Sequence, residues 1–185
     1  MSNRGYKIKN LNGIYFISFS VVEWIDVFTR KDYVFKVVDS LNYCQKEKGL
    51  IVYAWCIMSN HVHLICEAKE GNLSAIIRDF KSFTSKVILS EIQKNTKESR
   101  RNWMLWMFEK AARSNKRNKK FQFWRQDNHP IELLPHQDSF ASQKLEYIHN
   151  NPVEAMIVEK AEEYIFSSAR DYAGIQGLIK VQIYE

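Results

Sequence analysis

The sequence predicts an α+β domain with a ferredoxin-like (RRM-like) core, in which a mainly antiparallel sheet is flanked by helices and followed by a C-terminal helix. Three observations lead to this fold class. Alternating, strand-like segments are interleaved with segments of helical periodicity. Their order is strand, helix, strand, strand, helix, then a later strand and helix, as in a βαββαβ unit. The 185 residues, 45% of them hydrophobic, suffice for one core, so we expect a single domain over residues 1–185.

The first two elements are a strand and a long helix. The apolar stretch 14–22 alternates and runs into Glu23 and Asp26 without a small-residue cleavage site, so a strand is a better interpretation than a signal peptide. A helix is expected at 30–48, because apolar residues recur there at helical spacing and Gly49 closes the element. These apolar residues are Val34, Val37, Val38, Leu41 and Cys44.

Basic side chains gather in two places, and the net charge of +6 is compatible with a polyanionic partner. The second long helix, which Asn72 can cap, has a partly basic face, although a solvated surface is the commoner role of such a face. Segment 97–125 has a local net charge of +8, so the rest of the chain sums to −2. The candidate DNA-binding residues from the two places are Lys116, Arg117, Lys119, Lys120, Arg78 and Lys81.

Segment 97–125 also interleaves aromatic with basic residues. We expect a helix at 100–112, a polar loop and a short aromatic strand at 121–124. Exposed aromatic faces next to cations suit unpaired bases, because the cations neutralise phosphates while the rings stack on bases. Aromatic residues are nevertheless more often buried, and we expect most of Trp103, Trp106 and Phe108 to be core.

The hairpin predicted from the runs 50–58 and 61–67 carries two histidines. Successive side chains of a strand point to opposite faces, so His61 and His63 project together while Val62 faces the other way. Two imidazoles on one face can hold one metal ion, although an isolated pair of this kind is more often structural. The hairpin should place them at the centre of the sheet, where the last helix can approach.

The last helix supplies a candidate nucleophile. Its buried stripe contains Ala141, Leu145 and Ile148, and an adjacent stripe contains Lys144, Tyr147 and Asn151. Because a proline disfavours helical geometry in the residue before it, we expect the helix to end at Asn151, ahead of Pro152. A tail at 153–185 follows.

Together, the two clusters predict a metal-assisted reaction. A phenol has a pKa of about 10 and needs a charge-stabilising partner to act as a nucleophile. A divalent ion held by His61, His63 and the Asn151 side-chain oxygen would polarise a phosphodiester next to Tyr147. Two nitrogens and an amide oxygen suit Mg²⁺ or Mn²⁺, and ligand type alone leaves Zn²⁺ open.

Several motifs resemble a known family. The string YAWCIMSNHVHLI resembles the HUH motif of the single-tyrosine transposases, and YIHNNPVEAMIV resembles the tyrosine helix of their REP-associated branch. The strings FQFWRQDNHPIEL and YIFSSARDYAG resemble the same branch. This resemblance covers nearly the whole chain from Gly13 onward.

The resemblance implies a ferredoxin-like fold, a divalent metal and cleavage of single-stranded DNA near a hairpin or palindrome. Tyr147 would form a 5′-phosphotyrosine and release a 3′-hydroxyl, so that strands can be rejoined without ATP. His61 and His63 match the metal ligands, and Asn151 stands where insertion-sequence relatives carry a ligating glutamine. The resemblance leaves a monomer and a homodimer open.

Two other functions fit the residues. A non-catalytic single-stranded nucleic-acid-binding protein would use the sheet and the basic segment but would not need the histidine and tyrosine set. A hydrolytic metallonuclease would use the same ion to activate water. Three cysteines without metal-binding spacing and the absence of a membrane-length apolar stretch predict a soluble, cytoplasmic protein that associates with the nucleoid when bound to DNA.

Overall fold

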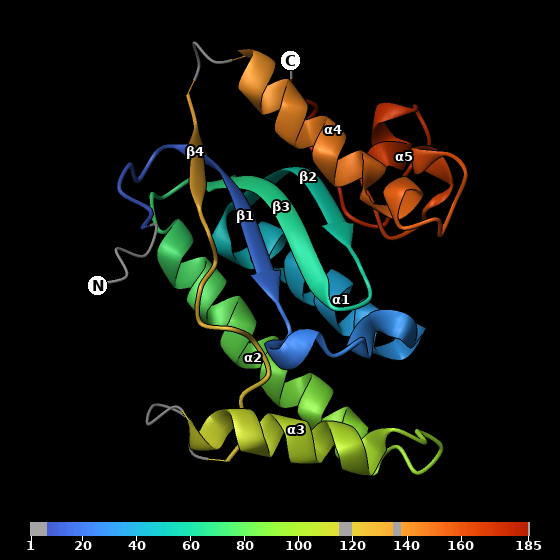
Figure 1. The fold of residues 1–185 in the computed structure, drawn as a ribbon. Coiled ribbons are helices and arrows are strands. Elements are labelled where there is room, and N and C mark those ends of the chain that lie inside the picture. Colours follow the sequence, from blue (N-terminus) through green and yellow to red (C-terminus); the bar gives the residue numbers. More distant parts are fainter. Residues whose placement is uncertain (1–6, 115–119, 135–137, 185) are drawn as a thin grey trace.

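The computed structural model describes residues 7–114, 120–134 and 138–184. It forms an antiparallel four-stranded sheet in the order β2-β3-β1-β4, flanked by helices (Figure 1). The strands are β1 (Ile14–Ser20), β2 (Leu50–Ile57), β3 (His61–Ala68) and β4 (Ile131–Leu133). The α-helices are α1 (Lys31–Lys48), α2 (Leu73–Lys94), α3 (Arg101–Arg113), α4 (Asp138–Glu154) and α5 (Ala169–Tyr172). Single 3₁₀ turns are η1 (Val22–Trp24), η2 (Val27–Thr29) and η3 (Ala161–Glu163).

The two faces of the sheet have different coverings. Alternate residues of β1 and β3, such as Ile17 and Leu64, belong to a large core with α1 and α2. The other alternate residues, such as Phe16 and Ile65, belong to a smaller core with Ala141 and Ile148 of α4. This strand order and this burial confirm the predicted ferredoxin-like core, with β3 in an interior position. The buried stripe predicted for the last helix is confirmed for Ala141 and Ile148, whereas Leu145 is partly buried and packs against the smaller core.

Segment 121–124 is not the strand that its aromatic residues suggested. It pairs with Val21, the residue directly after β1, through one isolated bridge at Trp124, and the fourth strand is β4 further along the chain. The backbone N–H of Gln122 donates to the Phe108 carbonyl of α3 at 3.0 Å. The side chains of Phe123 and Trp124 enter the large core. The segment is therefore tied both to α3 and to the residue after β1, which leaves too little paired length for a strand.

The helix α4 does not end at Asn151, contrary to expectation. It continues to Glu154, because Pro152 removes only one helical hydrogen bond and the next ones form: the Ala155 N–H donates to the Asn151 carbonyl at 3.0 Å. The helix stops just before Met156, which has a φ of 55°. Asn151 thus stays in helical register with Tyr147.

The expectation for the α3 tryptophans is also wrong. Phe108 is fully buried, as expected, and so is Met104. Trp103 and Trp106, however, are 49% and 54% exposed. In an amphipathic helix the face opposite the buried one is in solvent, and both tryptophans fall on it. Among the described residues, none of the helices is both long and apolar enough to cross a membrane.

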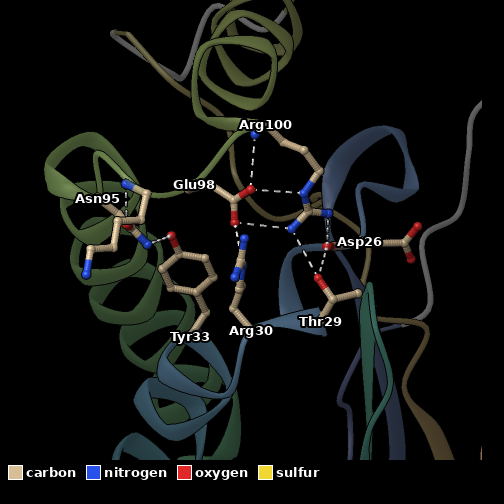
Figure 2. Close-up of polar contacts among 8 residues, drawn as sticks. Asp26, Thr29, Arg30, Tyr33, Asn95, Glu98 and Arg100 are labelled. Atoms are coloured by element: carbon tan, nitrogen blue, oxygen red, sulfur yellow. Dashed lines mark hydrogen bonds and ion pairs between the residues drawn. The ribbon is translucent and has the colours of Figure 1, made fainter.

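A buried carboxylate ties α3 to the loop before α1 (Figure 2). The Glu98 side chain is completely buried and pairs with Arg30 at 3.0 Å and with Arg100 at 3.1 Å. The same Arg100 guanidinium donates to the Asp26 carbonyl at 2.8 Å and to the Thr29 hydroxyl at 3.1 Å. This cluster fixes the loop 26–29, which reaches the functional site.

Candidate active site

His61 and His63 lie side by side on the face of β3 that α4 covers. Their ring centroids are 4.7 Å apart, and Val62 and Leu64 are buried in the core on the opposite face. The shared orientation predicted from the alternation of a strand is therefore confirmed. Antiparallel pairing with β1 places Ser20 opposite His61, and β2 closes the other side of β3.

The ring of His61 is oriented by a short hydrogen-bond chain. Its Nδ1 lies 2.7 Å from the Asn60 side-chain oxygen. The Asn60 amide nitrogen donates to Asp26 at 2.9 Å, and the Ser59 hydroxyl donates to the same carboxylate oxygen at 2.6 Å. Because the amide nitrogen of Asn60 is used in this way, its oxygen must accept, and Nδ1 of His61 carries the proton. The Nε2 atom is then the one with a free lone pair.

His63 is a buried histidine whose ring nitrogens both lack a hydrogen-bond partner among the described residues. Its residue is 4% exposed, and Phe16 stacks on the ring with centroids 5.6 Å apart. Burial lowers the pKa of His63 to about 3, and the positive charges of His61 and Lys144 act in the same direction. The ring is therefore neutral at pH 7 and keeps a lone pair. Leaving a buried polar atom without a hydrogen bond costs about 1–3 kcal/mol. A bound cation would offset this cost at a His63 nitrogen.

The stripe of α4 that carries Tyr147 faces this pair of histidines. The Tyr147 ring centroid is 5.2 Å from that of His63, while the residue is 43% exposed. The Lys144 ammonium lies 5.9 Å from the Tyr147 ring centroid and 5.2 Å from that of Phe16. A nucleophile candidate, a cation and the imidazoles thus converge within one chain.

Asn151 completes the cluster from the next turn of α4. Its amide nitrogen donates to the Tyr147 carbonyl at 3.3 Å, and its side chain also hydrogen-bonds His61. Burial lowers the pKa of His61, and its contact with the Asn151 side chain, which offers a neutral amide oxygen, opposes this shift. No group of three His, Cys, Asp or Glu side chains in the described part of the chain is placed to hold a metal, so a third ligand would be this neutral oxygen.

The basic residues expected to bind DNA are placed in different ways. Arg78 pairs with its neighbour Asp79 at 2.9 Å. Lys81 donates to the Arg125 carbonyl at 2.7 Å and to Asn128 at 2.5 Å, so it holds the segment 125–128. Lys120 lies over the Phe121 ring. Lys116, Arg117 and Lys119 lie outside the described residues. DNA contact by these six side chains stays a prediction.

Sequence reasoning missed the supporting residues of the site. Asn60 directly precedes His61, and this adjacency was the available signal. Asp26 had no such signal, because only the fold brings the loop before α1 to the hairpin turn. Lys144 was placed on the tyrosine stripe without a role, although its spacing from Tyr147 indicated the shared face.

Three comparisons with known proteins bear on this arrangement. The family model "Transposase IS200 like" matches residues 18–126, more than half of the chain, which include both histidines but not Tyr147. The search of curated proteins found no match. Among solved structures, a REP-associated tyrosine transposase bound to a REP hairpin is 16% identical, with a TM-score of 0.59. That match covers 100% of this chain and 94% of the other, and it shows a shared fold.

Proposed function

Because the chain belongs to the IS200-like transposase family, we propose that it cleaves and rejoins single-stranded DNA beside a hairpin, with Tyr147 as the nucleophile. One observation carries this proposal: the phenol lies 5.2 Å, between ring centroids, from a buried imidazole with unpartnered nitrogens. The protein of similar fold is bound to a REP hairpin, which supports a hairpin as the DNA partner here.

The donor set fits a divalent cation. His61 and His63 would each contribute a neutral imidazole nitrogen and Asn151 an amide oxygen, which suits Mn²⁺ or Mg²⁺. When bound, such an ion supplies positive charge to an oxygen of the scissile phosphate. The Asn60 and Asp26 hydrogen bonds keep the His61 ring in the tautomer that this role requires.

The side chains of α4 perform the strand cleavage. The Tyr147 oxygen forms a bond to phosphorus, and the bond from phosphorus to the 3′ oxygen breaks. The 3′ oxygen takes a proton to become a hydroxyl, and the phenolic proton passes to solvent, to which Tyr147 is open. The Lys144 ammonium stabilises the negative charge that develops there. One phosphodiester is exchanged for another, so the reverse attack can rejoin strands.

We further propose that Tyr147 acts on DNA bound by its own subunit. The described part of one chain contains both the imidazole pair and the helix with the phenol, in contact through the rings of Phe16, His63 and Tyr147. A second subunit is not needed to complete this arrangement. Mixing a Tyr147→Phe variant with a His63→Ala variant tests this, since recovered activity in the mixture would mean that the tyrosine acts on DNA bound by another subunit.

Trapping a covalent adduct tests the proposal. The protein is incubated with Mn²⁺ or Mg²⁺ and a single-stranded oligonucleotide that contains a REP hairpin, the DNA to which the protein of similar fold is bound. We expect a protein–DNA adduct that survives denaturation, is lost on chelation and is abolished in Tyr147→Phe. The matched control is Tyr43→Phe, since Tyr43 is a similarly exposed tyrosine on α1.

Other products would contradict the proposal. Cleavage without a protein-linked strand would indicate a hydrolytic metallonuclease. Binding that is insensitive to chelator, with no cleavage in any metal, would indicate a non-catalytic binding protein. An adduct that persists in Tyr147→Phe would exclude this tyrosine as the nucleophile.

A further inference from the structure

An exposed tryptophan stands next to the proposed active site. Trp24 is 54% exposed, and its ring centroid lies 6.0 Å from that of His61, with the two planes at 79°. A single exposed aromatic side chain is common on protein surfaces, so the surroundings of Trp24 decide whether it has a role. No role for Trp24 was predicted from its place between the first strand and the first helix.

The backbone at Trp24 is held in an unfavourable conformation. Glu23 and Trp24 both have a φ of 53°, a region that costs a non-glycine residue about 1–3 kcal/mol. The surrounding structure maintains it: the Trp24 carbonyl accepts from the Asn60 amide at 3.2 Å. Two residues later, the Asp26 carbonyl accepts from Arg100 at 2.8 Å, as Figure 2 shows. Hydrogen bonds therefore fix the backbone that carries this exposed indole.

A cation accompanies the indole. The Arg125 guanidinium carbon lies 5.8 Å from the Trp24 ring centroid. Its backbone is anchored twice, by its N–H to the Ser20 carbonyl at 2.8 Å and by its carbonyl to the Lys81 ammonium at 2.7 Å. The guanidinium also pairs with Asp127 at 3.4 Å, and its side chain is 44% exposed. An aromatic face with an adjacent cation is the combination that binds an unpaired nucleotide, through base stacking and phosphate neutralisation.

We propose that Trp24 and Arg125 form a nucleotide-binding subsite, in which the indole stacks on an unpaired base of the strand that Tyr147 attacks. This inference rests on the proposed function, because it takes single-stranded DNA as the ligand. Stacking tolerates any base, so the subsite would position the strand beside His61 without reading its sequence. Asn60 contacts both the Trp24 backbone and the His61 ring, so strand position and imidazole orientation share one support.

Binding to two matched DNA probes tests the subsite. One probe is a DNA hairpin with unpaired thymidine tails, and the other has the same hairpin with abasic tails, which keep the phosphates and lack the bases. Affinity is measured with chelator present, so that cleavage does not contribute. We expect Trp24→Ala to weaken binding of the thymidine probe about 5- to 150-fold, the effect of losing one stacked base, and to leave binding of the abasic probe unchanged. Trp24→Phe should recover most of the affinity.

Tyr43→Ala is the matched control. Tyr43 is 57% exposed and lies on α1, outside the basic segment 97–125 and the proposed active site. The Tyr43→Ala variant should bind both probes like the wild type. Equal affinity of Trp24→Ala and wild type for the thymidine probe would overturn the subsite, as would an equal loss on the abasic probe or with Tyr43→Ala. Because the assay needs no cleavage, its outcome is separate from that of adduct formation.

Discussion

Replacing Glu98 with glutamine removes the charge at the centre of the cluster in Figure 2. Burial raises the pKa of this carboxyl, but hydrogen bonds from the Arg100 side chain and backbone and from Arg30 outweigh it, and the pKa falls from 4.5 to about 2. At about 1.4 kcal/mol per pKa unit, the fold favours the carboxylate over the neutral acid by about 3 kcal/mol. Arg30 and Arg100 are partly open to solvent and regain water in the variant. We therefore expect Glu98→Gln to lower the free energy of unfolding by about 2 kcal/mol at neutral pH.

The effect should depend on pH in a defined direction. The pKa of Glu98 is lower in the folded chain than in the unfolded one, so its contribution is complete above about pH 4.5 and is lost as the pH falls towards about 2. Urea unfolding, followed by tryptophan fluorescence, should give a wild-type-to-variant difference that shrinks over this range. The control is Glu109→Gln, because Glu109 forms an exposed pair with Arg113 at 3.1 Å, worth about 0.5 kcal/mol or less.

Two results would refute this reasoning. The first is a Glu98→Gln variant as stable as the wild type at neutral pH, which would mean that the buried carboxylate contributes nothing beyond its neutral isostere. The second is a constant difference between the two proteins from neutral to acidic pH. In that case the loss would come from packing, and the ion pairs with Arg30 and Arg100 would not be its cause.

Two further predictions concern the supports of the site. Asn60→Ala removes the acceptor of the His61 Nδ1 proton. We therefore expect the affinity for Mn²⁺, measured by calorimetry, to fall about 10- to 100-fold. An unchanged affinity would show that the His61 ring needs no such support. Lys81→Met removes the ammonium that holds Arg125 and Asn128. The Arg125 backbone amide donates to the Ser20 carbonyl, and its hydrogen exchange should become about 10-fold faster or more, because a charged hydrogen bond is worth about 1.5–3 kcal/mol. An unaltered exchange rate would contradict the role of Lys81 in holding this segment.

Much of the site follows from local periodicity. The alternation of a strand dictates that His61 and His63 share a face, and helical spacing dictates that Tyr147 and Asn151 share another. The hydrophobic pattern also decides which face of each element turns inward. A βαββαβ order then leaves few ways to pair the strands, and the resulting sheet brings the two polar faces together.

The features that sequence reasoning missed depend on competition between distant segments. Segment 121–124 has strand-like residues, but its backbone bonds to α3 and to the residues directly after β1, and β4 is the strand that pairs with the free edge of β1. Trp103 and Trp106 are hydrophobic enough for a core, but the face of α3 that carries Met104 and Phe108 is the one that packs against the rest of the chain. Neither the pairing of segment 121–124 nor the buried face of α3 can be predicted from the residues of that element alone.

The residues that break ordinary rules of stability gather around one point of the fold. His63 is buried with unpartnered nitrogens among the described residues, and Trp24 is exposed on a left-handed backbone. Both features are unfavourable by themselves, and the hydrogen bonds of Asn60 to the Trp24 carbonyl and to Asp26 maintain the backbone at Trp24. Clustering of this kind is typical of a site kept for binding and chemistry. A cation at the imidazoles and a DNA strand on the indole would relieve these costs together, which is why we assign both to the same surface.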